Sequence, residues 1–398
     1  MTPGSSTESR PSTPKFHVPA DLLGPEVAAM PSTHKIHILG DDERAKFIAH
    51  ALSGVYDAVE LLSRRPHPPH KYSQIQRPRF NDKQTEYVVE SNQALRVLNK
   101  KGDKALIDQL VVSGQGVQAA EALESVKDRV DQQTTVCLMN DGLGVLDDVR
   151  KRIFNTPDSA PRFVLGHMSH TLAFNRKSNS VKLLKNGYTK LTLGYPRFDD
   201  DKNPTITSEE DGVNFVSAWK GAKGLRTSLE PYDAWLRFKL PSVIFDAVVE
   251  PVCVMLEMPY QGILQNSAAR RLMHSLLDEI VAVVDNMPEV RESLIVKEYI
   301  RGKSIHRMLQ KKIMGKRDTP SQLNRRIDRG LPTDVEYLNG YFIRRGDKLG
   351  VDLRTNIMVR DMIKAKHSQA IEKLNSYVPV EETSVPSHMA FRYRTVPK

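Results

Sequence analysis

The chain has 398 residues, of which 39% are hydrophobic and 27% charged, and its formal net charge is +10 at pH 7. This length is enough for two domains, and the composition is that of a globular protein. The chain has no run of eighteen apolar residues, which argues against a membrane-spanning helix. Its two cysteines, Cys137 and Cys253, lie in apolar runs and argue against a disulfide framework or cysteine-ligated metal site. We therefore predict an intracellular, reducing compartment and no metal site.

The first 33 residues are rich in Ser, Thr and Pro and show little periodicity, which predicts a disordered segment. Arg10 and Lys15 fit a mitochondrial presequence, whereas the acidic residues of the segment do not. The expected location is therefore mitochondrial or cytoplasmic, with the mitochondrion favoured.

A strand–turn–helix–strand pattern follows over residues 35–65. An apolar run over 36–39 ends at Gly40, helical periodicity covers 47–52, and a second apolar run covers 58–62, as in the first unit of a dinucleotide-binding domain. Such a unit needs G-x-G-x-x-G, but the loop reads GDDERA, so Asp42 replaces the glycine that lets the backbone approach the pyrophosphate. We expect Asp41 or Asp42 to cap the helix with its own carboxylate.

Strand and helix patterns then alternate. Strands are predicted over 106–113, 134–139 and 162–166, and helices over 117–130 and 145–153. This alternation predicts a mainly parallel sheet covered on both faces. Residues 66–79 form a Pro/His-rich loop, and Asn186-Gly187 predicts a hairpin over 175–194. The polar stretch over 195–211 is the expected interdomain connection.

Strand patterns stop at Val213. Residues 233–258 form a long apolar stretch that is interrupted by Pro241 and Pro251. Residues 268–286 have helical periodicity, and further helices are predicted over 294–314, 333–349 and 356–376. We therefore predict an α/β Rossmann-like domain over 34–212, an all-α domain over 213–378 and a tail over 379–398.

The order of these landmarks resembles that of the ketopantoate reductases (2-dehydropantoate 2-reductases). NDGLG over 140–144 resembles the family's Q-N-G-x-G turn, AVVEPVCVML over 247–256 resembles N-A-x-x-N-P-L-T-A-L, and TDVEYLNG over 333–340 resembles T-E-I-D-Y-I-N-G. The resemblance implies a Rossmann domain, a helical domain like the C-terminal domain of 6-phosphogluconate dehydrogenase, and an active site between them. In the family, NADPH reduces the ketone of ketopantoate.

The resemblance also implies which residues occupy the family's active-site positions. A lysine of the family gives a proton to the developing alkoxide, asparagines and a serine hold the substrate, and a glutamate supports the site. With Pro251 aligned to the family's proline, these positions fall on Ser242 (lysine), Asp246 and Glu250 (asparagines), Ser321 or Gln322 (serine), Asp334 (glutamate) and Asn140 (turn asparagine).

Several of these residues do not suit the family's chemistry. Ser242 is a poor acid, but Lys239 lies three residues earlier and is a candidate substitute. Asp246 and Glu250 would repel the carboxylate of a keto acid, and we expect them to form ion pairs with nearby arginines.

The candidate cofactor residues are Gly40, Gly142, Arg64 and Arg65. The two arginines follow the second strand, where NADP enzymes place a base for the 2′-phosphate. The implied cofactor is NADPH, and the altered glycine loop predicts that its binding is impaired.

Between residues 301 and 329 the chain has ten Lys or Arg and two acidic residues. This stretch predicts a patch for a polyanion such as RNA or a ribosome, and a solvated helix face is the alternative. Few aromatic residues lie near it, which favours backbone contact over base readout. The patch candidates are Lys311, Lys312, Lys316, Arg317, Arg325 and Arg326.

The fold positions thus match the family better than the chemical positions do. Our leading hypothesis is a degenerate, non-catalytic scaffold that binds an anionic partner. The alternative is an active NADPH-dependent reductase of ketopantoate or another 2-oxoacid, with Lys239 as the acid. A homodimeric scaffold is the third hypothesis.

Overall fold

The computed structural model describes residues 35–63, 74–81, 84–91, 95–99, 105–155, 160–175, 180–193 and 209–376. The predicted disordered segment, Arg64, Arg65, most of the predicted interdomain connection and the predicted tail lie outside these ranges.

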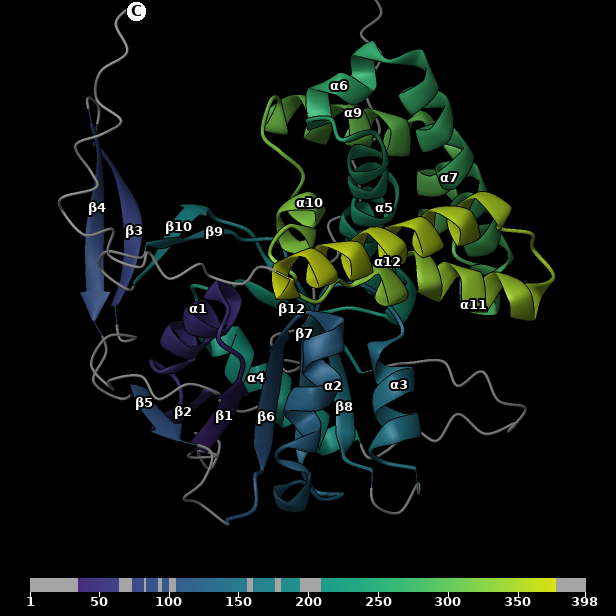
Figure 1. The fold of residues 1–398 in the computed structure, drawn as a ribbon. Helices are drawn as coiled ribbons and strands as arrows, with labels where there is room; N and C mark the ends of the chain where they lie inside the picture. The colour runs from purple at the N-terminus through teal and green to yellow at the C-terminus, as the bar shows by residue number, and fades with distance from the viewer. Residues whose placement is uncertain are drawn as a thin grey trace, which may run out of the picture. The chain divides into compact units, whose positions relative to one another are not determined.

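The main sheet has eight strands in the order β12-β11-β8-β7-β6-β1-β2-β5 (Figure 1). All neighbouring strands are parallel except β8 and β11, so the predicted mainly parallel sheet is confirmed. The strands are β1 (Lys35–Leu39), β2 (Ala58–Ser63), β5 (Leu95–Asn99), β6 (Gln109–Gly114), β7 (Thr135–Asn140), β8 (Arg162–Met168), β11 (Thr189–Thr192) and β12 (Thr227–Leu229).

Both faces of this sheet are buried. Along β6, Leu110 and Val112 join one hydrophobic cluster, whereas Val111 joins the other, as expected from the two-residue period of a strand. The first cluster includes α2 (Gly116–Glu124) and α3 (Val145–Arg152), and the second includes α1 (Glu43–Leu52) and α4 (Glu209–Gly221). The helices therefore cover the two faces in pairs, as in a Rossmann-like fold.

A second sheet has four strands in the order β4-β3-β10-β9: β3 (Gln74–Asn81), β4 (Gln84–Ser91), β9 (Thr171–Asn175) and β10 (Ser180–Lys185). Two predictions are wrong here. The predicted loop over 66–79 contains the beginning of β3. The predicted hairpin around Asn186-Gly187 does not form, because β10 pairs with β9 while β11 pairs with β8.

The reason for the glycine at position 187 is a close backbone approach. A Cβ at Gly187 would lie 2.5 Å from the backbone nitrogen of His170. The Asn-Gly pair therefore lies where the chain passes from one sheet to the other, and it does not join two paired strands.

The rest of the described chain is helical, apart from β12. The predicted end of strands at Val213 is wrong for that one strand. The helices are α5 (Tyr232–Leu256), α6 (Tyr260–Gln265), α7 (Ser267–Asn286), α8 (Leu294–Arg301), α9 (Lys303–Lys316), α10 (Gln322–Ile327), α11 (Asn339–Leu349) and α12 (Arg354–Asn375). The predicted Rossmann-like region followed by a helical region is confirmed. The boundary at 212/213 stays a prediction. Two elements near or beyond it, α4 and β12, contact strands of the main sheet.

Some predicted helices are shorter than expected. The predicted helix over 294–314 is two helices, α8 and α9, separated at Gly302. The helix predicted over 117–130 ends at Glu124 and is followed by a short 3₁₀ turn, η3 (Lys127–Arg129). The segment predicted over 333–349 consists of the 3₁₀ turn η6 (Val335–Tyr337) and α11.

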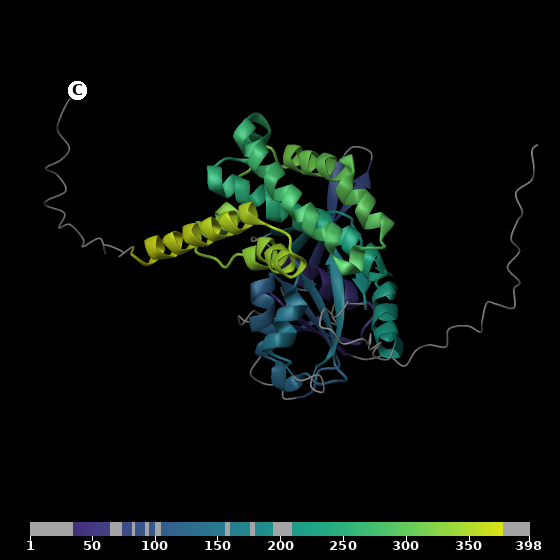
Figure 2. The ribbon, with the colours of Figure 1, turned by 90° about the vertical axis from the view of Figure 1, so that its right-hand side faces the viewer.

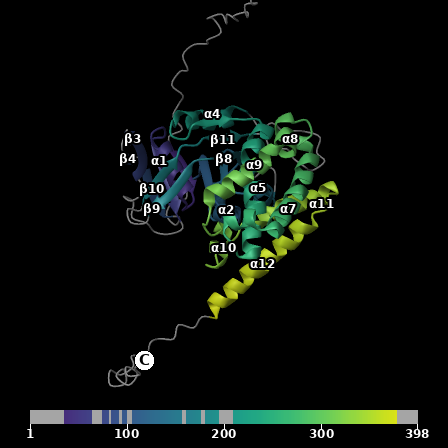
Figure 3. The same ribbon diagram turned by 90° about the horizontal axis from the view of Figure 1, so that it is seen from above.

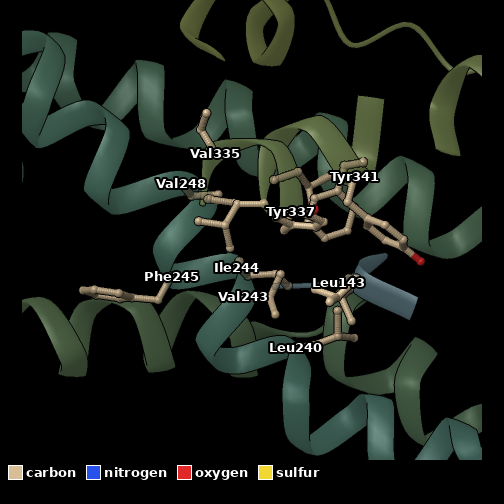
Figure 4. Packing of buried hydrophobic residues seen from close by; sticks show 14 of the residues in the cluster. Leu143, Leu240, Val243, Ile244, Phe245, Val248, Val335, Tyr337 and Tyr341 are labelled. Atoms are coloured by element: carbon tan, nitrogen blue, oxygen red, sulfur yellow. The ribbon is translucent and has the colours of Figure 1, made fainter. Parts of the chain in front are cut away.

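Helix α5 is the centre of the helical region and contacts α7, α8, α10 and α12. Pro241 and Pro251 lie inside it without ending it. Its buried side chains join the same hydrophobic cluster as one face of the main sheet. Figure 4 shows part of this cluster, with Tyr337, Tyr341 and Leu143 close to Leu240, Val243 and Ile244 of α5.

Helix α12 is less enclosed. Its buried residues are Asn356, Val359 and Ile363, all in its first half, and its last turns extend beyond the neighbouring helices (yellow in Figure 2). Among the described residues, none of the helices combines the length and the apolar character needed to cross a membrane.

Candidate active-site region

The loop between β1 and α1 is where the pyrophosphate of a dinucleotide lies in Rossmann folds. Gly40 keeps a positive φ of 154° there. Asp42 is the N-cap of α1, and its Oδ1 accepts hydrogen bonds from the Ala45 backbone N–H (2.8 Å) and from Ser113 Oγ (2.8 Å). The expected self-capping of this helix is confirmed, with Asp42 as the capping residue.

Arg44 ties this loop to the turn after β7. Its guanidinium donates to Asp141 Oδ2 (2.8 Å) and to the Met139 carbonyl oxygen (3.0 Å), and its Nε lies 3.9 Å from Asp42 Oδ2. Burial alone would raise the pKa of Asp141, but Arg44 outweighs it and the net pKa is lowered. Burial raises the pKa of Asp42, although Arg44 and the two hydrogen bonds oppose it.

Lys239 reaches this turn from α5. It is 3% exposed, and its Nζ donates a hydrogen bond to the Asn140 carbonyl oxygen. Burial, opposed by Asp141 and aided by Arg44, lowers the pKa of Lys239 to about 8. Ser242 lies at the family's lysine position, and its Oγ donates to the Lys239 carbonyl oxygen of the same helix (2.9 Å). The structure thus brings Lys239, and not Ser242, into hydrogen-bond contact with Asn140.

A small pocket opens beside Lys239. Two of its lining residues have buried polar atoms without a hydrogen-bond partner among the described residues: Oδ1 of Asn140 and Nε1 of Trp235. The Asn140 amide group donates to the Gly114 carbonyl oxygen (3.2 Å). The pocket is lined by Leu138, Asn140, Gly142, Leu143, Gly144, Val145, Leu146, Leu165, Gly166, Tyr232, Trp235, Lys239 and Tyr341.

Asp334 lies at the N-terminus of α2, where its Oδ1 accepts from the Val117 backbone N–H (3.3 Å). Burial, together with the negative charge of Asp141, raises the pKa of Asp334 to about 7. Lys239 is close enough to be influenced by this carboxyl, so the structure gathers Asn140, Lys239 and Asp334 in one region.

Tyr337 of η6 contacts the turn after β7 and the helix that follows it. Its carbonyl oxygen accepts from the Leu143 backbone N–H (2.8 Å), and its hydroxyl donates to Asp148 (2.7 Å). Gly142 has a φ of 75°, and a Cβ there would lie 2.5 Å from the Tyr337 carbonyl oxygen. Gly142 therefore has a structural reason to be glycine besides any contact with a cofactor.

Glu250 lies at one of the two positions where the family has a substrate-binding asparagine. Its carboxylate already accepts hydrogen bonds from groups of the protein. Its carboxylate accepts from Tyr260 Oη (2.5 Å), Ser321 Oγ (2.7 Å) and the Leu323 backbone N–H (3.2 Å), and it lies 3.5 Å from Lys316 Nζ. The expected pairing with an arginine is wrong for Glu250, because a lysine supplies the positive charge.

Asp246, at the other asparagine position, is partly buried. Burial and the neighbouring Glu250 raise the pKa of Asp246 to about 7, although Lys312 and Lys316 oppose this change. Its balancing charges thus also come from lysines.

The predicted basic patch is divided by the fold. Three of its six side chains contact interior groups: Lys312 donates to the Pro241 carbonyl oxygen (2.9 Å), Lys316 lies on Glu250, and Arg326 donates to Gln115 Oε1 (2.5 Å). Lys311, Arg317 and Arg325 are exposed. The six residues therefore do not form one exposed surface.

Two residues of this region were not predicted from the sequence. Neither Arg44 nor Trp235 was a candidate, although Arg44 lies inside the GDDERA loop and Asp141 inside the NDG turn. Both segments follow strands of one parallel sheet, whose carboxyl ends meet at one edge. The opposite charges were thus a usable signal, whereas nothing in the sequence identified Trp235.

Comparison with known proteins gives consistent matches. The family model described as ketopantoate reductase PanE/ApbA matches residues 36–196, and the model of its C-terminal part matches residues 235–367. A 2-dehydropantoate 2-reductase of Aquifex aeolicus is 22% identical over 259 residues, covering 65% of this chain and 76% of the relative. One from Saccharomyces cerevisiae is 24% identical over 290 residues, covering 67% and 73%.

Solved structures agree in fold. A PanE/ApbA family ketopantoate reductase from Ralstonia eutropha superposes with a TM-score of 0.61 at 13% identity, covering 85% of this chain and 99% of that one. A D-mandelate dehydrogenase in complex with NADH and anilino(oxo)acetate gives a TM-score of 0.60 at 18% identity, with the same coverage.

Proposed function

This chain belongs to the ketopantoate reductase family, and on that premise we propose that it is a non-catalytic member that serves as a binding scaffold. Its Rossmann-like fold is one that holds nicotinamide cofactors in similar proteins. The proposal is that this chain keeps the fold without the reaction.

The Asp42 cap carries the proposal. In a working dinucleotide site, backbone N–H groups at the start of the first helix point at the pyrophosphate. Here the Asp42 carboxylate already accepts from the Ala45 N–H and from Ser113. A phosphate brought within about 4 Å of this carboxylate would meet a repulsion of roughly 4 kcal/mol at an effective dielectric constant near 20. The site is thus filled by the protein's own anion.

The substrate positions support the same proposal. A keto acid would bring its carboxylate toward Glu250, whose oxygens already accept bonds from Tyr260, Ser321 and Leu323. The nearby Lys316 also contacts Glu250, so it does not offer a free positive charge to a substrate.

A second candidate is an active NADPH-dependent reductase in which Lys239 is the acid. The observation that favours it is the contact between Lys239 and Asn140 beside the pocket, together with a pKa of about 8 for Lys239, close to a working pH. In this candidate the nicotinamide would supply hydride and Lys239 would give a proton to the growing alkoxide.

One experiment separates the two candidates. The full-length protein is titrated with NADPH, followed by nicotinamide fluorescence, and is assayed for NADPH oxidation with ketopantoate. We expect no saturable binding below millimolar NADPH and no turnover. Micromolar binding with turnover, abolished in Lys239→Met, would establish the reductase and refute the scaffold proposal.

Three further parts of the proposal concern the surroundings of the protein. An anionic partner, such as RNA or the mitochondrial translation apparatus, is suggested by the net charge of +10. A mitochondrial location, suggested by Arg10 and Lys15, is tested by fractionating cells that express a tagged protein.

A homodimer is suggested by the similar fold of a dimeric ketopantoate reductase from Staphylococcus aureus (TM-score 0.58, 12% identity), and light scattering tests it.

A further inference from the structure

Helix α9 has an unbalanced charge. Its 14 residues, KSIHRMLQKKIMGK, include five lysines or arginines and no acidic residue. Ile305, Leu309 and Ile313 are buried and hold the helix against its neighbours. Because Lys312 and Lys316 contact interior groups, the exposed basic side chains are Lys303, Arg307 and Lys311. They recur every four residues, which places them about 6 Å apart along one side of the helix.

Helix α7 adds to this surface. The rings of His274 on α7 and His306 on α9 stack with their centroids 5.3 Å apart and their planes at 21°, so the two helices are adjacent there (Figure 3). Arg270 and Arg271 precede His274 by one turn and are exposed. We call Arg270, Arg271, His274, Lys303, His306, Arg307 and Lys311 the α7–α9 basic face.

The charges of this face are free to meet a ligand. None of its five lysines and arginines forms an ion pair with any residue that the structure describes. The exposed Asp278, one turn beyond His274, is the acidic residue that bounds it on α7. Arg301 lies nearby in sequence but is neutralised by Asp285 at 2.6 Å.

The α7–α9 basic face also carries a pair of stacked aromatic rings, which binding to phosphate groups alone would not require. Both imidazoles of the stacked pair are exposed and are flanked by basic residues. An aromatic ring beside lysines and arginines suits a nucleic acid whose bases are unpaired, because a base can stack on the ring while the phosphates meet the cations. A base inside a duplex is not available for such stacking.

A membrane surface fits less well. Peripheral helices that lie on membranes expose an apolar side to the lipid. Ile305, Leu309 and Ile313 of α9 are instead buried in the protein, and the row Lys303, Arg307 and Lys311 is polar throughout.

We infer that the α7–α9 basic face binds single-stranded nucleic acid, with the lysines and arginines on the phosphates and the His274–His306 pair against a base. This inference deepens the proposed scaffold function, on which it rests, by naming the chemistry of the partner. It also relocates the interaction predicted from residues 301–329. Of the six predicted patch residues only Lys311 remains, and Arg270 and Arg271 of α7 are added.

The test is fluorescence anisotropy of the full-length protein with a labelled 20-nucleotide oligouridylate between 50 and 200 mM salt. We expect saturable binding that weakens with salt, with a log–log slope of roughly −3 if about four phosphates are neutralised. Arg271→Glu/Arg307→Glu should reduce affinity at least about tenfold and flatten the slope. His274→Ala/His306→Ala should weaken binding several-fold with the slope unchanged, because stacking releases no counterions.

The matched control is Lys348→Glu/Lys373→Glu, which changes the net charge equally at exposed positions on α11 and α12. It should change affinity less than about threefold. The inference is overturned if the wild type does not bind at 50 mM salt, if the control loses as much affinity as the test pair, or if the histidine variant binds normally. Tighter binding to anionic lipid vesicles, or equal binding to a duplex of the same length, would also overturn it.

The outcome is separable from that of the NADPH titration. Oligonucleotide binding together with NADPH turnover would refute the non-catalytic proposal and leave this face in place. Absence of both would refute the face and leave the non-catalytic proposal in place.

Discussion

At the scale of single residues, several polar side chains near the family's active-site positions bond to one another. Asp42 bonds to Ser113, Arg44 to Asp141 and Glu250 to Ser321. Under the proposed function, each pair would leave fewer polar groups available to an incoming ligand. The inward bonding also makes these residues part of the stability of the fold, which can be measured without any ligand.

The Asp42 cap is the first such contribution. Replacing Asp42 with Ala removes the bonds to the Ala45 N–H and to Ser113, so we expect the free energy of unfolding to fall by about 1–2 kcal/mol. Urea denaturation followed by circular dichroism measures it. The exposed Asp108→Ala is the control and should change stability by less than about 0.5 kcal/mol. An Asp42 variant as stable as the control would show that the cap contributes nothing.

Asp246 makes stability depend on pH. Burial and Glu250 raise its pKa to about 7, although Lys312 and Lys316 oppose this shift. The ordinary pKa of an aspartate in an unfolded chain is about 3.9. The folded state therefore binds more protons between about pH 4 and 7, and wild-type stability decreases as the pH rises through that window. Asp246→Asn cannot ionise, so it should match the wild type near pH 4 and exceed it at pH 8 by on the order of 1 kcal/mol.

Thermal unfolding at several pH values measures this difference. The exposed Asp318→Asn is the control and should not gain stability at pH 8. A stability difference for Asp246→Asn that stays constant between pH 4 and 8 would contradict the assignment.

The sequence predicted some of these residues and not others, for physical reasons. The Asp42 cap follows from a local rule, because a carboxylate one residue before a helix bonds the free N–H groups of its first turn. The partner of Glu250 was predicted as an arginine and is Lys316, 66 residues away. Such pairs depend on how α9 docks on α5, and no local pattern encodes that docking.

At the scale of elements, the same distinction holds. The parallel strands follow from short apolar runs and α7 from its helical periodicity, and both signals act within one segment. The hairpin predicted at Asn186-Gly187 failed because the same dipeptide serves another need, the close approach of Gly187 to the backbone of His170. A turn-forming dipeptide indicates a backbone that requires glycine, but not which strands pair around it.

Gly142 shows how one element locks another. Its φ is 75°, and an added Cβ would lie only 2.5 Å from the Tyr337 carbonyl oxygen, so there is no room for a side chain. We expect Gly142→Ala to cost about 2–3 kcal/mol, since it combines backbone strain with the separation of η6 from the β7–α3 turn. Urea denaturation measures the loss.

The control is Gly54→Ala, where an added Cβ meets nothing within 4 Å. Its effect should stay within about 1 kcal/mol in either direction. Equal effects of the two substitutions would mean that η6 is not held through Gly142.

At the scale of the whole molecule, one hydrophobic cluster runs from a face of the main sheet into the helices around α5. Leu138 of β7 and Leu240 of α5 belong to the same cluster. Since neither region completes this core alone, we expect the sheet and the helices to unfold together, although long chains often unfold in steps.

The chain offers a direct test, because it has two tryptophans. Trp219 lies on α4 in the second cluster, and Trp235 lies on α5 in the first. Trp219→Phe and Trp235→Phe each leave one reporter. In each variant, the midpoint of the fluorescence transition should equal the midpoint of the circular-dichroism transition. A reproducible separation between fluorescence and circular dichroism in either variant would show that the two regions unfold independently.

The carboxylate of Asp42 has a consequence for how the protein's abundance is controlled. A protein that binds a ligand only when folded gains stability of RT ln(1 + [L]/Kd), so its folded population follows the supply of that ligand. If the Asp42 carboxylate, which accepts from the Ala45 N–H, excludes NADPH as we propose, the protein gains no stability from that cofactor by this route. The lifetime of such a protein in the cell would be set by its own folding and its partners, and would not follow the metabolic state of the nicotinamide pool.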